Sequence, residues 1–183
     1  QHGYIEIFEV YVMFFEKIKE DTGITQRLVN ITAGVADNGK SGLSVACYMG
    51  KVDMAKRILI FLKGIILTEE VVYQKQAWHI ISSSVFNKNA LYIACFIDKN
   101  ATVNKTEENG LAILQAIFET CKEIQENNSA FRLAVYQFLF SLESGQNVLL
   151  ASATNKQYKI LSEVLQWPEK LDIDTMSYDE IFL

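Results

Sequence analysis

Hydrophobic residues recur at helical spacing along much of the chain. Leu43, Ala46 and Cys47 lie at positions i, i+3 and i+4, which places them on one side of a short helix. Gly50 follows them and suits the positive φ with which many helices end. A second apolar stripe then begins, with members three or four residues apart: Val52, Ala55, Ile58, Leu59 and Leu62. The pattern predicts a short helix and a longer antiparallel helix joined by a tight turn.

Two later stretches have the same apolar spacing. One lies between residues 131 and 142, and its members are Phe131, Ala134, Val135, Phe138, Leu139 and Leu142. The other consists of Tyr158, Leu161, Val164 and Leu165. It is followed by Trp167-Pro168, and we expect the helix to end there because a proline disfavours helical backbone at the residue before it. Pro168 is the only proline of 183 residues. Because proline interrupts helices, its scarcity favours long helices joined by turns, and the sequence predicts an all-α dominated fold.

Similar windows recur along the sequence and indicate an internal repeat. When Ser41, His79, Ala112 and Asn147 are taken as equivalent positions, the spacings are 38, 33 and 35 residues. A period in this range is typical of solenoid units that contain two helices. Asn-Gly pairs occur at 38–39 and 109–110. They would supply the residues of positive φ for a tight hairpin tip that precedes the first helix of a repeat unit.

These residues resemble the ankyrin-repeat family over about Asp37 to Trp167. Asn38-Gly39 is similar to the hairpin turn of that family, and residues 41–47 are similar to its first helix. Asn100-Ala101-Thr102-Val103-Asn104 is similar to its exit loop, whereas the proline of the family's first helix is absent. The resemblance implies an ankyrin-repeat α-solenoid of helix-turn-helix units with short β-hairpin-like loops.

The resemblance also implies three segments. Residues 1–36 would form a partial N-terminal repeat or capping helices, and residues 37–167 would form about four degenerate repeats. Residues 168–183 would be an acidic C-terminal cap or tail. The stretches 62–76 and 119–129 are longer than the family pattern, so the register of the middle repeats stays open.

Composition and charge exclude several classes of protein. Half of the residues are apolar, which excludes intrinsic disorder. The longest apolar stretch, Ala90–Ile97, is too short to span a membrane. The net charge is −5, and Glu169–Leu183 supplies four of these negative charges, so the chain has no excess of positive charge that would bind nucleic acid.

The cysteines indicate the cellular compartment. There are three of them, and their spacing is not that of a disulfide-bonded framework, which indicates a reducing, cytoplasmic compartment. Abundant Asn, Lys and Ile would suit a bacterial effector that acts in host cytosol.

One motif competes with the repeat interpretation. Gly34-Val-Ala-Asp-Asn-Gly39-Lys40-Ser41 matches the phosphate-binding loop Gly-x4-Gly-Lys-Ser. Backbone N–H groups would surround the phosphates, Lys40 would reach the β- and γ-oxygens, and Ser41 would bind Mg²⁺. The parallel sheet of such a protein needs several near-continuous apolar strands, and the sequence offers at most three. A P-loop nucleotide-binding NTPase is therefore the alternative function.

Other catalytic or metal-binding combinations are scarce. His2 and His79 are the only histidines, and neither has a cysteine or carboxylate at ligand spacing, so we expect no metal and no cofactor. His79 would begin a helix in the repeat register. Cys47 and Cys95 lie on apolar stripes and should be buried, whereas Cys121 lies among charged residues and should be partly exposed. The sequence predicts a protein that is not an enzyme.

The resemblance implies an adaptor or scaffold that binds another protein in a concave groove, as a monomeric module. Positions in the family pattern place the candidate partner-binding residues at hairpin tips and at the inner end of first helices. They are Lys40, Tyr48, Trp78, Ile80, Phe86, Ile113, Gln146 and Thr154. Trp78 has two interpretations, because tryptophan is enriched among interface anchors but could equally pack over the long 62–76 connection.

Overall fold

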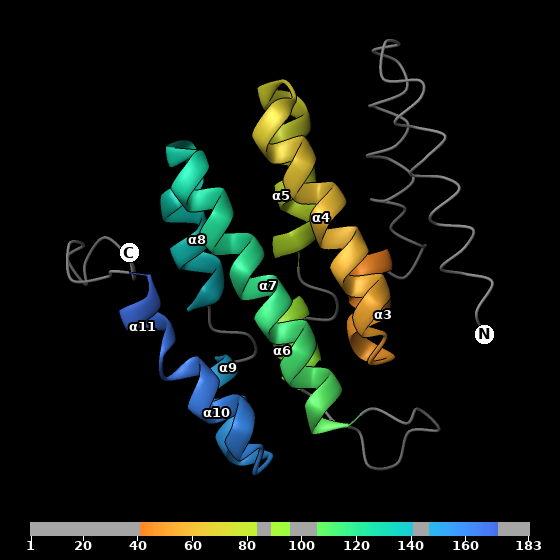
Figure 1. Ribbon diagram of the computed structural model, residues 1–183, viewed down its shortest axis with the longest axis vertical. Helices are drawn as coiled ribbons and strands as arrows, with labels where there is room; N and C mark the ends of the chain where they lie inside the picture. Colours follow the sequence, from red (N-terminus) through yellow and green to blue (C-terminus); the bar gives the residue numbers. More distant parts are fainter. Residues whose placement is uncertain (1–40, 84–88, 96–105, 141–146, 172–183) are drawn as a thin grey trace.

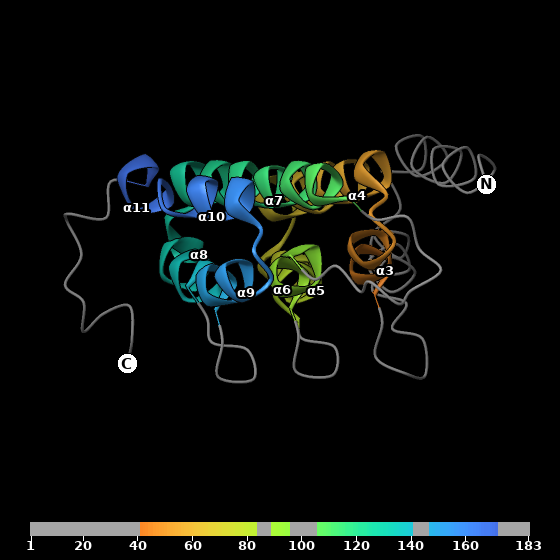
Figure 2. The same cartoon turned by 90° about the horizontal axis from the view of Figure 1, so that it is seen from below.

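The computed structural model describes residues 41–83, 89–95, 106–140 and 147–171, and every regular element in these ranges is a helix. The helices form two layers (Figures 1 and 2). The outer layer contains α4 (Val52–Thr68), α7 (Glu107–Asn127), α10 (Tyr158–Val164) and α11 (Trp167–Lys170). The inner layer contains α3 (Gly42–Tyr48), α5 (Val71–Ser82), α6 (Ala90–Cys95), α8 (Arg132–Leu139) and α9 (Val148–Thr154). The predicted all-α character is confirmed for the described residues.

The three short inner helices begin in the same way. Ser41, Asn89 and Asn147 precede α3, α6 and α9, and each side-chain oxygen accepts a hydrogen bond from the backbone N–H three residues later. The distances are 3.1, 2.9 and 2.9 Å. Serine and asparagine are favoured at this N-cap position because they bond an N–H group that the helix leaves without a partner. These caps mark the starts of three helix pairs, α3–α4, α6–α7 and α9–α10.

Two of the pairs also share the geometry of the turn between their helices. The residue after the C-cap has a left-handed backbone in both, Gly50 with φ 64° after α3 and Lys156 with φ 57° after α9. Its N–H bonds to the carbonyl three residues back, and the next N–H bonds to the carbonyl five residues back. The distances are 3.3 and 2.9 Å in the first turn and 3.1 and 2.9 Å in the second. Gly50 therefore ends α3 as its position in the sequence predicts.

The predicted register is correct at its ends and wrong in the middle. Ser41 and Asn147 are equivalent caps, but His79 lies in the last turn of α5 and Ala112 lies inside α7. The middle cap is Asn89, so the spacings are 48 and 58 residues instead of 38, 33 and 35. The physical reason is the presence of α5 and α8, which return along the outer helices before the next short inner helix begins (Figure 1).

The additional helices pack on the outer helices that precede them. Helices α4 and α7 extend well beyond the short inner helices, and α5 and α8 cover these extensions (Figure 1). Trp78 on α5 lies with its ring centre 5.8 Å from that of Phe131 in the 3₁₀ turn Ser129–Phe131. It also lies 5.7 Å from Phe138 on α8. These ring contacts make α5 and α8 neighbours in the inner layer.

The core lies between the layers and follows the predicted stripes in most helices. Cys47 and Cys95 are buried, as expected. The expectation for Cys121 is wrong, because it lies on the same side of α7 as buried Ile117 and Ile124, and burial raises the pKa of its thiol. In α10 the buried residues are Ile160 and Val164, so the predicted stripe is correct at Val164 and wrong at Tyr158 and Leu165, which are exposed.

Asn109-Gly110 forms no hairpin tip, because both residues lie in the first turns of α7. A Cβ atom on Gly110 would lie 2.6 Å from the backbone oxygen of Ala94, so the glycine allows α6 and α7 to touch. The predicted tip at 38–39, the loop at 100–104, the segment 1–36 and most of 168–183 lie outside the described residues.

The last of the described helices, α11, lies at one end of the outer layer (Figure 2). Its Pro168 lies in the first turn, where a missing backbone N–H has no cost. Trp167 is fully buried and stacks on Phe118 of α7, with ring centres 4.9 Å apart. The Tyr136 hydroxyl of α8 donates to the carbonyl of Leu171 at 3.2 Å. The chain after α10 is thus held against both layers.

Candidate functional site

Polar side chains of the outer layer bond to one another across neighbouring helices. Lys63 on α4 forms an ion pair with Glu123 on α7. Gln115 on α7 donates to Glu163 on α10 at 3.1 Å. These bonds occupy polar groups on the surface of the outer layer and connect α4, α7 and α10.

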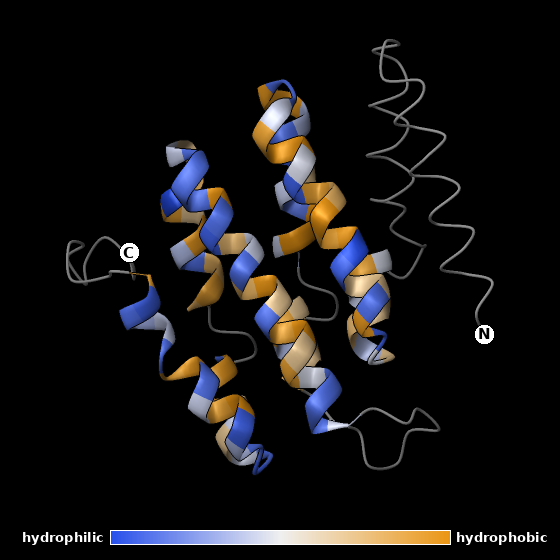
Figure 3. Ribbon diagram, viewed as in Figure 1, coloured by the Kyte–Doolittle hydropathy of each residue, from blue (hydrophilic) through white to orange (hydrophobic). Residues whose placement is uncertain are grey.

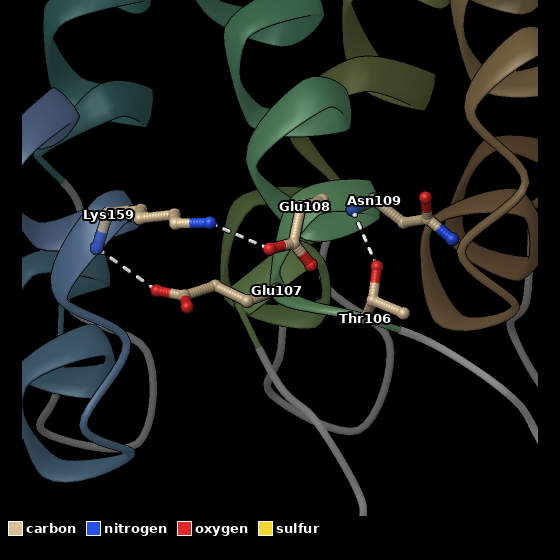
Figure 4. A network of polar contacts seen from close by, with 5 residues as sticks. All are labelled: Thr106, Glu107, Glu108, Asn109 and Lys159. Atoms are coloured by element: carbon tan, nitrogen blue, oxygen red, sulfur yellow. Dashed lines mark hydrogen bonds and ion pairs between the residues drawn. The ribbon is translucent and has the colours of Figure 1, made fainter.

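A second network joins the first turns of α7 and α10 (Figure 4). The Lys159 ammonium group lies 2.7 Å from a carboxylate oxygen of Glu108. Glu107 accepts a hydrogen bond from the backbone N–H of Lys159 at 3.0 Å, and so caps α10 from another helix. Thr106 caps α7 itself by accepting from the N–H of Asn109 at 3.2 Å.

The ion pairs shift the acidity of the groups that form them. The hydrogen bond from Lys159 lowers the pKa of Glu108, and the same bond raises the pKa of Lys159. Burial raises the pKa of Glu163, but hydrogen bonds from Lys170 and Gln115 contribute to a stronger opposite effect and the pKa is held below its usual value. Both carboxylates therefore serve contacts within the fold.

Charge is divided unequally between the two layers. Every carboxylate within the described helices lies in the outer layer, and hydrophilic residues recur along these helices in Figure 3. These acids are Asp53, Glu107, Glu108, Glu119, Glu123, Glu126, Glu163 and Glu169. The five inner helices contain only Lys75 and Arg132 as lysine or arginine residues, together with His79. Among the described helices, the inner layer therefore has no negative side chain; Glu69 and Glu70 lie directly before α5.

Large apolar side chains are exposed on the inner layer. Val45 is 44% exposed and Tyr48 is 43% exposed on α3, and Leu150 is 48% exposed on α9. Helix α6 contacts both of these helices, and its Tyr92 and Ile93 are half-buried. We call the exposed residues of the inner helices the inner face. It consists of Gly42, Val45, Tyr48, Val71, Val72, Lys75, His79, Arg132, Leu133, Gln137, Leu150, Ala153 and Thr154, with Met49 directly after α3.

Two of the predicted partner-binding residues lie on the inner face. Tyr48 and Thr154 are exposed, and each follows the N-cap of its helix by seven residues. Two others are wrong as surface residues, because Ile80 is 4% exposed and Ile113 is 0% exposed. The incorrect middle register placed them at tips, whereas they lie on the core sides of α5 and α7.

Trp78 is half-buried and packs against Phe131 and Phe138, which favours the interpretation that it is a packing residue. Lys40, Phe86 and Gln146 lie outside the described residues.

The phosphate-loop motif falls almost entirely outside the described residues, since Gly34, Gly39 and Lys40 are not among them. Ser41 is described, and it is 2% exposed. Its hydroxyl oxygen accepts the N–H of Ser44 at 3.1 Å, so it serves as the cap of α3. His79 is exposed in the last turn of α5, and its prediction as a helix-start residue is wrong.

Sequence reasoning missed Val45, Leu133 and Leu150 as surface residues. A usable signal was present, because an asparagine or serine cap precedes each short inner helix and counting from the cap locates the exposed positions. Asn89 is the cap that the predicted register passed over.

The described residues contain neither a candidate metal site nor a candidate membrane span. No group of three or more His, Cys, Asp or Glu side chains among them could hold a metal ion. No helix in this part of the chain combines the length and apolar character needed to cross a bilayer. Comparisons with protein-family models, curated proteins and solved structures found no match to the chain.

Proposed function

We propose that this chain is a non-catalytic adaptor module of ankyrin type that binds another protein through the inner face. The observation that carries the proposal is the contrast between the layers. Both layers expose large apolar side chains, such as Ile60 and Tyr158 in the outer layer and Val45, Tyr48 and Leu150 in the inner layer. Polar side chains of the outer layer bond to each other, whereas the inner layer contains no carboxylate in its described helices. Contiguous exposed apolar side chains are typical of interaction sites.

The ankyrin-type architecture is supported by the recurring helix pairs. Three short helices with the same cap lie in the inner layer, and two of them lead through the same left-handed turn into an outer helix. In repeat proteins of this kind, the inner helices and the tips beside them form an extended binding surface. Helices α5 and α8 would widen that surface along the axis of the outer helices.

The chemistry of the inner face suits binding better than catalysis. Its exposed residues are mostly aliphatic or aromatic, and such side chains supply binding energy through burial. Tyr48 combines a large apolar ring with a hydroxyl group, a combination enriched at interface centres. We propose that the module acts as a monomer in a cytoplasmic compartment, which is host cytosol if the protein is a bacterial effector.

The proposal is tested by selecting binding peptides on the intact chain and locating where they bind. The chain offers matched pairs of exposed residues. Tyr48 on the inner face corresponds to Tyr158 on α10, which is 69% exposed, and Leu150 corresponds to Leu165 just after α10. Tyr48→Ser and Leu150→Ser should each weaken peptide binding about tenfold, as expected for interface anchors. Tyr158→Ser and Leu165→Ser should leave it unchanged.

Unfolding curves of all four variants check that the fold persists. Peptides whose binding is lost only with the α10 substitutions would place the binding surface on the outer layer and contradict the proposal. A chain that recovers no binding peptide would contradict it as well.

A further inference from the structure

We infer that the partner offers an acidic amphipathic segment to the inner face, with carboxylates that meet Lys75 and Arg132; this inference rests on the proposed function. The outer-layer lysines Lys63, Lys159 and Lys170 each pair with a glutamate of the fold. Lys75, like Lys56 and Lys122 of the outer layer, has no ion-pair partner among the described residues, but it is exposed on α5, in a layer whose described helices contain no carboxylate.

The cations of the inner face lie beside exposed apolar side chains. Val72, Lys75 and His79 follow one another at spacings of three and four residues on the exposed side of α5. On α8, Arg132 is adjacent to Leu133, and its guanidinium carbon lies 6.0 Å from the ring centre of Tyr136. An aromatic ring below a guanidinium group holds it by cation–π attraction.

The inner layer has a cationic half, which also exposes Val71, Val72 and Leu133, and an apolar half without charge. Helices α5 and α8 are neighbours through the contacts of Trp78, so Lys75 and Arg132 belong to the same half. The short helices α3, α6 and α9 form the other half, and none of them contains a charged residue. In Figure 1, α5 and α8 lie higher in the view than α3, α6 and α9.

This arrangement favours one charge type in the partner. A segment with carboxylates over α5 and α8 gains attraction from the two cations and meets no negative side chain of the inner helices. A basic segment would be repelled there and would find no carboxylate in those helices to pair with. The apolar half requires hydrophobic residues on the same segment, and an amphipathic helix supplies them at spacings of three and four residues.

The test uses the intact chain and a random library of peptides of about 16 residues, enough for four helical turns. We expect the recovered peptides to be enriched in Asp and Glu, with apolar residues at helical spacing. Their affinity should fall when NaCl rises from about 50 to about 300 mM, because salt screens exposed charges. This salt titration needs no variant and therefore does not depend on how a substitution affects folding.

A pair of charge-reversed variants locates the effect. The double variant Lys75→Glu/Arg132→Glu should weaken the binding of acidic peptides at least about fivefold. Lys51→Glu/Lys56→Glu is the matched control, because it changes the net charge equally at two exposed residues of the outer helix α4 and its cap. It should change the affinity less than about twofold. Equal losses in the two variants would overturn the inference, since net charge alone would then explain them.

The remaining outcomes separate the two proposals. Peptides that need Tyr48 and Leu150 but show no acidic enrichment would overturn the inference and leave the proposed function intact. Sedimentation of the native chain with phosphatidylcholine vesicles containing about one third phosphatidylserine tests an anionic membrane as the target. Binding to these vesicles that Lys75→Glu/Arg132→Glu abolishes would assign the inner face to a membrane and overturn the inference.

Discussion

Replacing Lys156 by glycine should stabilise this protein, although glycine usually weakens a folded chain. Lys156 has φ 57° in the turn between α9 and α10, a left-handed conformation in which a Cβ atom crowds the following carbonyl oxygen. The equivalent turn between α3 and α4 has Gly50 with φ 64° at the same place and the same pair of backbone hydrogen bonds. The fold thus contains a strained and an unstrained example of one turn.

The expected gain follows from two opposing effects. A non-glycine residue pays about 1–2 kcal/mol for the left-handed backbone. Glycine removes that cost but loses about 0.5–1 kcal/mol through the greater freedom of the unfolded chain. Because the Lys156 side chain is exposed, no core contact is lost. The net change is a stabilisation of about 0.5–1 kcal/mol. The reverse change, Gly50→Ala, should destabilise the chain by a similar amount of about 0.5–1 kcal/mol.

Equilibrium unfolding in urea, followed by far-UV circular dichroism, measures both changes as shifts of the midpoint at constant slope. Ser162→Gly is the control, because Ser162 is an exposed residue inside α10 with right-handed helical backbone. That variant should lose about 0.5–1 kcal/mol of the free energy of unfolding. A Lys156→Gly variant that is destabilised like Ser162→Gly would refute the reasoning, since the turn would not then be left-handed in solution.

Four further predictions concern other parts of the chain. Gly64→Ala in the middle of α4 should raise the free energy of unfolding by about 1 kcal/mol, because a Cβ there meets no atom within 4 Å. Gly110→Ala should lower the thermal midpoint, because its Cβ would lie 2.6 Å from a backbone oxygen of α6; an unchanged midpoint would contradict this close contact. Lys159 lowers the pKa of Glu108, so their contact stabilises the fold above the usual carboxyl pKa of 4.5 and is lost as the pH falls through the lowered pKa. Glu108→Gln should therefore flatten the fall in unfolding midpoint below pH 4.5, and equal slopes would count against the contact. Finally, a fluorescent ATP or GTP analogue with Mg²⁺ should show no saturable binding, and binding that Lys40→Ala abolishes would favour the phosphate-loop alternative.

The sequence predicted the first helix pair correctly because the signals there are local. The stripe of Leu43, Ala46 and Cys47 and the turn at Gly50 each depend on residues a few positions apart, and the structure has both. The middle of the chain lacked such a signal. Helix α5 has its own buried residues, so its pattern resembles that of a repeat helix, and only tertiary packing shows that it is an additional helix.

The errors in the candidate site follow from the same cause. Tyr48 and Thr154 are exposed, as predicted, because Ser41 and Asn147 are equivalent caps, as in the predicted register. Ile80 and Ile113 were placed on the surface because the register assumed a first helix at each of them. Exposure at a given position depends on which layer its helix joins, and apolar spacing alone does not specify the layer.

The additional helices also explain how the proposed surface could grow without weakening the fold. Helices α5 and α8 join only the inner layer, so the contacts between α4, α7 and α10 in the outer layer continue past them. The ion pair of Lys63 with Glu123 and that of Lys159 with Glu108 remain between adjacent outer helices. The additional helices bring Lys75 and Arg132 to a layer whose short helices have no charge. The ion pairs between helices therefore lie in the outer layer and the proposed charge selection in the inner layer, which is why reversing the charge of Lys75 and Arg132 should alter binding more than folding.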